Sequence, residues 1–429
     1  MSDAPQGWWG RAVPPSPEVA PGARIVAAAA AAAERYGTPC YLTDLAELDS
    51  CAVRLRSAFP APWMVSYSLK ANPLPAIVGR LGGSGLGANV VSLGEWQAAS
   101  QAGVPNSQIT LEGIGKRDQD LELAVAAARS GAPLRWVTLE SAEETRELVH
   151  RARGLSRQQS LDVLLRLNPG VDPDTHSGLR VGAAESKFGL AAAELCDLAD
   201  EIAGAGTAVR LRGVHVHVGS QLRSPGAWAA AAERACHLAG ALAATHAEVD
   251  TVDVGGGFPA ASGVGPSPQD FRLAFDAELR SAGTPSPVRL AIEPGRYLVA
   301  SSGWLVTKVL HVRRRQADPQ VILDASFAEL VRPALYGARH SVFAVRSPEG
   351  PDANWRPTRV EGSLCESTDT FGVHDLPPLD RGDLVVMAET GAYASSMFSC
   401  YNGRVQPPEV MLRPDGEIEL ARPSRPFAP

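Results

Sequence analysis

The chain has 429 residues, of which 45% are hydrophobic and 20% are charged. This length exceeds one typical domain, and the composition is ordinary for a soluble globular protein. The formal net charge is −7, and no block of Lys or Arg occurs. These features argue against nucleic acid or an anionic membrane surface as a partner and favour a small-molecule ligand.

The six cysteines are scattered and form no C-x-x-C pair, which argues against both a zinc site and a disulfide framework. Near the N-terminus, the alanine-rich stretch from Ile25 to Ala33 is too short to span a bilayer. It also lacks the charged start of a signal peptide. We therefore expect a cytoplasmic protein with reduced thiols and no metal site.

A β-like run that begins at Trp63 ends at Lys70 and is followed at once by Ala71-Asn72-Pro73. Most lysines are solvated surface charges, which is the simplest interpretation of this segment alone. A lysine at the C-terminal end of a strand, just before a turn, is also well placed to present its amine inside a site. Such an amine can form a Schiff base, so Lys70 is a candidate catalytic residue.

The middle of the chain alternates short apolar runs with helix-like stretches rich in Ala, Leu and Glu. The runs cover residues 161–167, 211–218, 249–254 and 288–292, and the helical stretches cover 191–203, 227–245 and 271–281. Repetition of strand and helix from about residue 40 to 300 predicts a (β/α)8 TIM barrel, with a doubly wound open sheet as the alternative. Periodicity alone leaves both open.

Two histidines lie at the end of the run over residues 211–218. His215 and His217 alternate with apolar residues, so they face the same side of their strand. There they could bind a metal, stack on a ring or form hydrogen bonds in the core. Ser220 follows where the strand is expected to end.

Three glycines, Gly255 to Gly257, follow the next apolar run, and Glu293 follows the one after it. The bare N–H groups of the glycines could surround a phosphate, or the glycines could simply form a tight turn. An amine, a phosphate loop and a carboxylate at strand ends together fit pyridoxal 5′-phosphate (PLP). A lysine binds the aldehyde of PLP, and a glutamate can pair with its ring nitrogen.

Beyond Arg296 the pattern changes from alternating strands and helices to strands and turns. Apolar runs over residues 304–313, 321–324, 383–388 and 409–412 predict a second, mostly β domain.

Ten motifs in consistent order carry a family resemblance, which extends from about residue 37 to 412. The sequence resembles the diaminopimelate decarboxylase branch of the alanine-racemase-like PLP decarboxylases, which also include ornithine and arginine decarboxylases. The motifs are Tyr67-Ser-Leu-Lys-Ala-Asn72, Ser92-Leu-Gly-Glu95, Arg166-Leu-Asn-Pro-Gly170, Ser186-Lys-Phe-Gly189, His215-Val-His-Val-Gly-Ser-Gln221, Asp253-Val-Gly-Gly-Gly257, Glu293-Pro-Gly-Arg296, Arg332-Pro-Ala-Leu-Tyr336, Cys365-Glu-Ser367 and Gly391-Ala-Tyr393.

This resemblance implies a fold and an activity. The expected fold is a PLP-binding TIM barrel over residues 40–300 and a C-terminal β domain over residues 301–429. An N-terminal segment, residues 1–39, is expected to pack with the β domain. The implied reaction is decarboxylation of meso-diaminopimelate to L-lysine and CO2.

The resemblance also assigns residues to the cofactor. Lys70 would hold the PLP aldehyde, His217 would stack on the ring, and Glu293 would pair with the ring nitrogen. Residues around the phosphate and closing the site would be Ser220, Gly256, Gly257, Gly295, Arg296 and Tyr393.

A third set of residues would act on the substrate. Cys365 resembles the family's proton donor, and a thiol is mostly protonated near neutral pH. The family takes this loop from the neighbouring subunit, which implies a homodimer with shared active sites. Residues expected to bind the substrate are Arg296, Arg332, Tyr336, Glu366 and Tyr393. The first four would contact its far end, where the two arginines could bind a distal carboxylate.

Two departures keep other functions open. Asn89 stands where the family usually has Asp, which changes the charge near the cofactor. The segment Asp324-Ala-Ser-Phe-Ala-Glu329 differs from the usual loop before Arg332. The main alternative is a divergent paralogue of specialised metabolism that acts on a diaminopimelate-like or other modified amino acid. An amino-acid racemase and a non-catalytic PLP-binding homologue are further alternatives.

Overall fold

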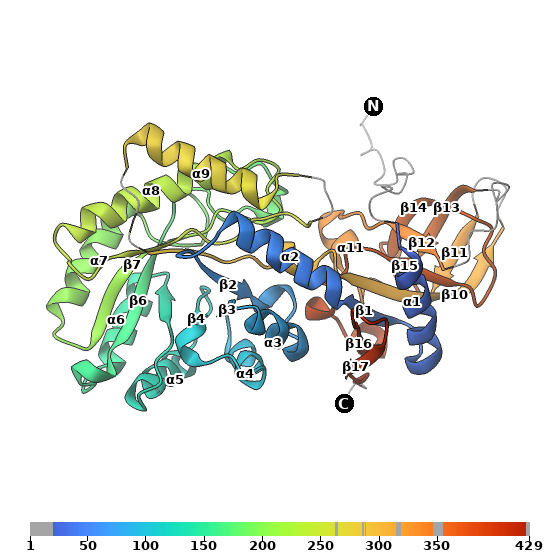
Figure 1. Cartoon of the computed structure of the whole chain (residues 1–429), viewed down its shortest axis with the longest axis horizontal. Coiled ribbons are helices and arrows are strands. Elements are labelled where there is room, and N and C mark those ends of the chain that lie inside the picture. The colour runs from blue at the N-terminus through green and yellow to red at the C-terminus, as the bar shows by residue number, and fades with distance from the viewer. Residues whose placement is uncertain are drawn as a thin grey trace. The chain divides into compact units, whose positions relative to one another are not determined.

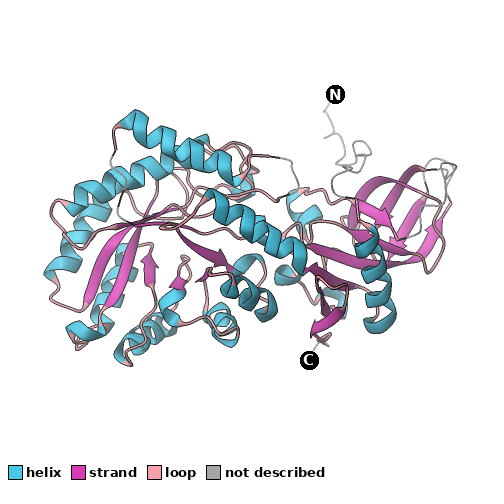
Figure 2. Cartoon of the chain, in the orientation of Figure 1, coloured by secondary structure: helices cyan, strands magenta, loops and turns pink. Residues whose placement is uncertain are grey.

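The computed structural model describes residues 20–261, 265–284, 287, 289–314, 319–345 and 355–425. The chain divides into two compact units (Figures 1 and 2). Cys51–Leu298 form the barrel unit; the described residues up to Ser50, together with those from Val299 onward, form the β unit. The structure defines each unit by itself. In the described part of the chain, no helix has the length and apolar character that crossing a membrane requires.

The described strands of the barrel unit close into a parallel barrel, because β9 pairs with β2 as well as with β8. This closure confirms the predicted TIM barrel and excludes the open sheet. In barrel order the strands are β2 (Met64–Ser68), β3 (Gly87–Val90), β4 (Ile109–Leu111), β5 (Trp136–Leu139), β6 (Leu161–Leu167), β7 (Val209–Val216), β8 (Thr251–Asp253) and β9 (Arg289–Ile292).

Helices alternate with these strands along the chain and lie around the barrel (Figure 2). They are α2 (Leu45–Ala58), α3 (Pro75–Gly83), α4 (Leu93–Gln101), α5 (Asp118–Arg129), α6 (Ala142–Arg151), α7 (Ala192–Gly204), α8 (Gly226–Ala243) and α9 (Pro268–Ala282). Local sequence sets the bounds of α9. Ser267 Oγ accepts a hydrogen bond from Asp270 N at 3.3 Å, and Gly283, with φ +68°, ends the helix.

Aromatic side chains pack α8 and α9 together on the barrel. Trp228 of α8 contacts Phe271 and Phe275 of α9, with ring centroids 5.4 and 6.2 Å apart. All three rings are buried. Burial of one such side chain contributes roughly 1.5–3 kcal/mol, so this cluster holds α8 and α9 together.

The β unit is built on one large sheet. Its strand order is β14-β13-β11-β10-β1-β16-β17, and β15 pairs with both β10 and β12. The elements are α1 (Ala23–Tyr36), β1 (Cys40–Asp44), α10 (Arg296–Val299, which contains the unit boundary), β10 (Gly303–Arg313), β11 (Gln320–Leu323), α11 (Arg332–Tyr336), β12 (Val342–Ala344), β13 (Arg356–Glu361), β14 (Thr370–Leu376), β15 (Leu384–Met387), β16 (Glu409–Leu412) and β17 (Ile418–Arg422). The predicted strands after residue 300 are confirmed by β10, β11, β15 and β16.

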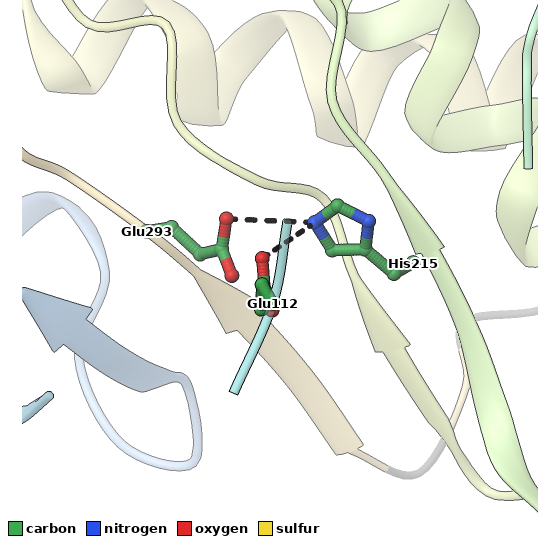
Figure 3. A group of neighbouring side chains, drawn as sticks. All are labelled: Glu112, His215 and Glu293. Carbon is green, nitrogen blue, oxygen red and sulfur yellow. Dashed lines mark hydrogen bonds and ion pairs between the residues drawn. The ribbon is translucent and has the colours of Figure 1, made fainter. Parts of the chain in front are cut away.

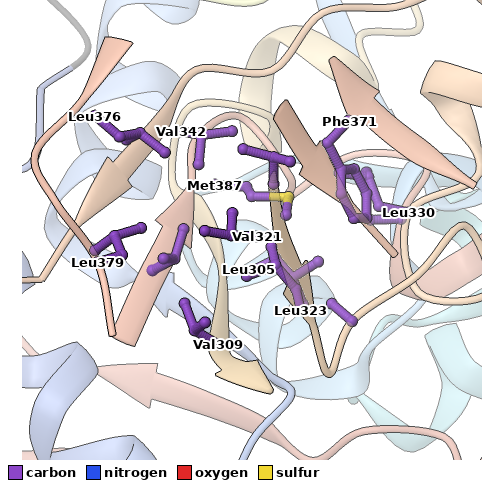
Figure 4. Close-up of a cluster of buried hydrophobic side chains, with 14 of the residues drawn as sticks. Leu305, Val309, Val321, Leu323, Leu330, Val342, Phe371, Leu376, Leu379 and Met387 are labelled. Atoms are coloured by element: carbon purple, nitrogen blue, oxygen red, sulfur yellow. The ribbon is translucent and has the colours of Figure 1, made fainter. Parts of the chain in front are cut away.

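The central strands of this sheet are buried on both faces. In β10, Leu305 lies in one apolar cluster, whereas Trp304 and Val306 lie in another. Figure 4 shows the first cluster, where Leu305, Val309 and Met387 meet. Because successive residues of a strand face opposite sides, a strand between two cores is apolar at nearly every position. This explains the continuous apolar runs in the sequence.

The predicted start of the barrel at residue 40 differs from the structure. β1 pairs antiparallel with β10 and parallel with β16, so it is a central strand of the β unit. Its residues divide between the two cores of that unit, with Tyr41 in one and Leu42 in the other. Helix α1 packs into the same core as Leu42. Residues 1–19 of the predicted N-terminal segment lie outside the described residues.

Candidate functional site

Polar side chains gather at the C-terminal ends of the barrel strands, the edge where TIM barrels place their active sites. Lys70 lies in η2 (Leu69–Ala71), a single 3₁₀ turn that follows β2. Its neighbours Leu69 and Ala71 are buried, whereas the Lys70 side chain is exposed. The turn therefore fixes the backbone of Lys70 and leaves its amine accessible to a ligand.

Glu293 directly follows β9 and is buried. Its backbone N–H donates to the carbonyl of Gly255 at 2.9 Å, and Ser68 Oγ donates to the carbonyl of Glu293 at 3.2 Å. Ser68 N also donates to the carbonyl of Pro294 at 3.1 Å. The segment that carries Glu293 is thus held both to the end of the strand preceding Lys70 and to the glycine loop.

Glu293 belongs to a buried cluster with Glu112, which follows β4, and His215 of β7 (Figure 3). His215 Nε2 lies 3.3 Å from Glu112 Oε2 and 3.4 Å from Glu293 Oε2. Asn89 of β3 donates a hydrogen bond to Glu293 Oε1. Thr138 of β5 donates to Glu112 Oε1 at 3.2 Å. The ends of β3, β4, β5 and β7 and the segment after β9 thus contribute to one polar network.

Burial shifts the protonation equilibria of this cluster. Burial, then the charge of Glu293, raises the pKa of Glu112 to about 7. Burial lowers the pKa of His215 to about 4, so its ring is neutral at pH 7. Nδ1 of His215 has no hydrogen-bond partner among the described residues, so Nε2, which faces both carboxylates, carries the proton.

His217 lies just beyond β7 and has different neighbours from His215. The N–H of Gly256 donates to His217 Nδ1 at 3.2 Å, which leaves the ring proton on Nε2. Burial, then the charge of Lys70, lowers the pKa of His217 well below its ordinary value. The two histidines of the motif therefore have different contacts: His215 contacts two carboxylates, and His217 contacts the glycine loop.

The remaining barrel residues that were predicted to surround a phosphate are also close to one another. Arg296 Nη2 donates to Ser220 Oγ at 3.1 Å. Gly257 has φ +116° and accepts a hydrogen bond from Leu222 N at 3.1 Å. A Cβ atom on Gly256 would lie 2.5 Å from the carbonyl oxygen of Glu293. The glycines thus allow the loop to pass directly beside the carboxylate segment.

These barrel residues fit PLP. They supply an accessible amine, a buried carboxylate and a hydroxyl–guanidinium pair, which are the groups that its aldehyde, ring nitrogen and phosphate require. A Cβ atom on Gly295 would lie 3.2 Å from the Cβ atoms of both Ala71 and Ser68. The turn that carries Arg296 therefore packs against the turn that carries Lys70, which brings the amine side and the phosphate side of the site together.

A second group of candidates lies in the β unit. Arg332 begins α11 and is buried. Its Nη1 donates to His340 Nε2 at 3.0 Å, and His340 Nδ1 donates to the carbonyl of Ala388 at 2.9 Å. His340 thus links the guanidinium to the end of β15. Tyr336 is the half-buried last residue of the same helix.

Cys365 and Glu366 lie on an exposed loop between β13 and β14. Asp369 holds this loop, since its Oδ2 accepts from Leu364 N at 2.8 Å and its N–H donates to the carbonyl of Glu366 at 3.2 Å. Tyr401 Oη donates to Glu366 Oε1 at 2.7 Å. The predicted proton donor and its acidic neighbour therefore sit on an ordered, accessible loop.

The Tyr401 ring stacks on Phe327 with a centroid distance of 6.0 Å. Phe327 belongs to the segment over residues 324–329 that departs from the family pattern, and its N–H donates to Asp369 Oδ1 at 2.7 Å. The departing segment therefore supports the Cys365–Glu366 loop through both Tyr401 and Asp369.

Tyr393 is half-buried and has φ +58°, a backbone conformation that is uncommon outside glycine. It follows Gly391, where a Cβ atom would lie 1.8 Å from the carbonyl oxygen of Val299. The Gly391-Ala-Tyr393 motif is thus a tight turn that sets the direction of the tyrosine.

Sequence reasoning missed Glu112, His340, Asp369 and Tyr401. Glu112 followed only a three-residue strand, too short to show a period. Its position one residue after an apolar run, as for Glu293, was the available signal. Asp369 contacts Phe327 from 42 positions away and Tyr401 contacts Glu366 from 35 positions away, and a single sequence does not reveal such contacts.

The chain is similar to known proteins over most of its length. The family described as "Pyridoxal-dependent decarboxylase, pyridoxal binding domain" matches residues 45–300. Diaminopimelate decarboxylase of Zymomonas mobilis is 33% identical over 390 residues, which cover 89% of each chain. That of Deinococcus radiodurans is 34% identical over 385 residues, covering 89% of this chain and 91% of the relative.

A solved structure extends the likeness to the fold of both units. The structure of diaminopimelate decarboxylase from Helicobacter pylori complexed with L-lysine has a TM-score of 0.83 and 29% identity. It covers 91% of this chain and 95% of the other. The chain therefore belongs to the pyridoxal-dependent decarboxylases, and within them to the diaminopimelate decarboxylase family.

Proposed function

We propose that this protein decarboxylates meso-diaminopimelate to L-lysine and CO2 with PLP as cofactor. The observation that carries the proposal is that the likeness to diaminopimelate decarboxylases spans both units, covering 89–91% of the chain. It therefore includes the β-unit residues Arg332 and Cys365 as well as the barrel. A match limited to the barrel would leave the substrate open.

PLP, when bound, would supply an electron sink for the electron pair that remains at Cα after CO2 leaves. Lys70 would hold its aldehyde through Nζ, and Glu293 would face the ring nitrogen. His217 would lie on the ring face and Tyr393 would close the site. Its phosphate would be bound by Ser220, Arg296 and the backbone of Gly256, Gly257 and Gly295.

The β-unit residues would read the substrate and complete the reaction. Arg332 and Arg296 would bind the distal carboxylate, because a planar guanidinium matches a carboxylate bidentately. Tyr336 and Tyr393 would add contacts, and Glu366 would accept from the distal ammonium. The Cys365 thiol would deliver a proton to Cα, and its exposure leaves the Sγ–H accessible.

The first experiment is CO2 release from meso-diaminopimelate by PLP-loaded protein, with amino-acid analysis of the product. L-lysine and CO2 in equal amounts, lost in Lys70→Ala, are the expected result. Ornithine, lysine and arginine serve as competing substrates. Turnover of only a monocarboxylate would refute the assignment of Arg332, and a Lys70-dependent visible PLP band without any turnover would favour a modified amino acid as the substrate.

We also propose that the active unit is a homodimer whose sites combine Lys70 of one subunit with Cys365 of the other. The exposed position of the Cys365–Glu366 loop supports this, since its end is available to a second chain. Mixing Lys70→Ala and Cys365→Ser subunits should restore about a quarter of wild-type activity, because one of the two sites in each mixed dimer is intact. Two inactive variants that stay inactive after subunit exchange would contradict shared sites.

A cytoplasmic location is the remaining part of the proposal. All the described cysteines are free thiols, which fits a reducing compartment. Fractionation of the native host, with detection of the protein by antibody, tests this location.

A further inference from the structure

The carboxylates of Glu112 and Glu293 lie close together inside the barrel. Both side chains are buried. One carboxylate oxygen of Glu112, one of Glu293 and one ring nitrogen of His215 all lie within 4.8 Å of one another. Among the described residues, His215 is the only basic side chain within 4.0 Å of either carboxylate, and its ring is neutral at pH 7. Two buried like charges this close are strongly unfavourable without a compensating cation.

In the part of the chain that the structure describes, no Lys or Arg forms an ion pair with either carboxylate. Asn89 of β3 and Thr138 of β5 contact the pair as neutral hydrogen-bond donors. Asp253 of β8 is buried and adds a third carboxyl group, whose pKa is raised by burial and then by the charges of Glu293 and Glu112.

The nearby cations have other partners or act at longer range. Arg166 of β6 pairs with Glu140, which follows β5, at 2.7 Å. The charge of Lys70, which follows β2, is felt at His215 and His217. Arg135 lies just before β5, and its charge is felt at Asp253. The cheapest way to hold the two glutamates together is therefore to leave a proton between them.

We propose that Glu112 is a positioning residue of the cofactor site: in the cofactor-free protein it shares one proton with Glu293, so that the pair carries a single negative charge until the cationic ring of PLP binds. This inference rests on the proposed cofactor. Glu112 acts through Glu293. Its own carboxylate is held by Thr138 and His215, while Asn89 holds the other oxygen of Glu293.

The shared proton has a consequence for cofactor binding. A cationic ring nitrogen beside Glu293 favours the ionised form of the pair, so PLP binding should release the proton. The raised pKa of Glu112, about 7 in the free protein, places this release within the physiological pH range. The site would thus exchange a carboxyl proton for the positive charge of the ring.

Infrared spectroscopy of the cofactor-free protein tests the shared proton without any PLP. We expect a carbonyl-stretch band from a buried protonated carboxyl group that titrates near pH 7 in the wild type. Glu112→Gln, which keeps the shape and removes the proton site, should abolish this band. Glu409→Gln, at another buried glutamate in the β unit, is the matched control and should keep it. The same titration persisting in Glu112→Gln would overturn the proposal.

Isothermal titration calorimetry of the cofactor-free protein with PLP tests the coupling. Measured at pH 7 in buffers of different ionisation enthalpy, wild type and Glu409→Gln should release more protons than Glu112→Gln, by up to about one per site. Equal proton release in all three would overturn the coupling. If the wild type binds no PLP, the proposed function fails, and the infrared result still decides whether the proton is shared.

A second variant keeps the proposal testable if Glu112→Gln does not fold. Asn89→Asp places a further carboxyl group against Glu293 and should move the infrared titration to higher pH. A shift to lower pH would contradict the shared proton. Metal analysis of the purified protein tests whether the two carboxylates bind a cation instead of sharing a proton. A stoichiometric divalent cation on Glu112 and Glu293 would require both carboxylates to be ionised and would overturn the proposal.

Discussion

The two units hold their candidate functional residues in different ways. In the barrel, Glu112, His215 and Glu293 are buried and linked by hydrogen bonds between strand ends. In the β unit, Cys365 and Glu366 are exposed on a loop that Asp369 and Tyr401 hold. One region places charge inside a rigid closed sheet, and the other presents reactive groups on a supported surface loop.

This difference suggests a division of labour. A buried network shifts the protonation equilibria of its members, because burial and close charges of the same sign disfavour the ionised forms. An exposed loop can meet a substrate or another subunit with little desolvation. Substitutions in the buried barrel cluster should therefore change cofactor binding and pH dependence, whereas those at Arg332 or in the Cys365–Glu366 loop should change substrate recognition and leave the cofactor bound.

Lys70→Ala should give the largest effect, on the barrel side of this comparison. Loss of the amine removes covalent attachment of PLP, and CO2 release should fall by at least about 10³-fold. The visible PLP band should disappear with it. Lys308→Ala, at an exposed lysine of β10, should match the wild type in both measurements. A variant that keeps the band would show that another amine holds the cofactor.

Arg332→Ala should give the next largest effect, and it should appear in substrate recognition alone. Loss of a guanidinium–carboxylate contact predicts a fall of roughly 10²–10³-fold in kcat/KM for meso-diaminopimelate. The PLP band should be unchanged. Arg339→Ala, at an exposed arginine of the same unit, is the control. Loss of the PLP band in Arg332→Ala would contradict the proposed division of roles, because Arg332 would then also affect cofactor binding.

Glu112→Gln should change how stability depends on pH. The pKa of Glu112 is raised to about 7 in the folded protein, so between its ordinary value and pH 7 the folded state binds more protons than the unfolded state. Stability from this group is therefore greatest at low pH and is lost as the pH rises through 7. The effect is on the order of a few kcal/mol. The difference between the urea midpoint at pH 5.5 and that at pH 8 should be smaller in the variant than in the wild type.

Tyr401→Phe should give the smallest effect. It removes one hydrogen bond to the exposed Glu366 and keeps the stacked ring, so KM for meso-diaminopimelate should rise only about 3- to 10-fold. Steady-state kinetics with a separate measurement of PLP content check this result. A change in kcat with KM unchanged would mean that Tyr401 orients Cys365 and not Glu366.

Much of the fold follows from local pattern. The alternating strands and helices between residues 161 and 292 predict the barrel because each strand is followed by a helix of the right length. The boundary at residue 40 was wrong because β1 is short and apolar, which fits a barrel strand and a central sheet strand equally well. Only its pairing with β10 and β16, far along the chain, decides between them.

The candidate site likewise contains some residues that local pattern predicts and some contacts that it does not. Lys70 and Glu293 were predictable because a reactive group after an apolar run points to the C-terminal edge of a parallel sheet. The sequence shows that Asn89 departs from the family pattern, but it does not show what Asn89 contacts. In the structure, Asn89 donates a hydrogen bond to Glu293, which lies 204 positions away in the sequence. Such a contact exists only after the barrel closes, so no local pattern encodes it.

The central position of β1 also bears on how the chain is synthesised. β1 ends at Asp44, and its antiparallel partner β10 begins at Gly303, so roughly 260 residues must be translated before the two can pair. At roughly 5–20 residues per second this takes on the order of tens of seconds, long enough for the barrel to fold first. During that interval β1 emerges as an apolar strand without its sheet. We therefore expect chaperones to bind β1 on the ribosome until β10 and β16 have been translated.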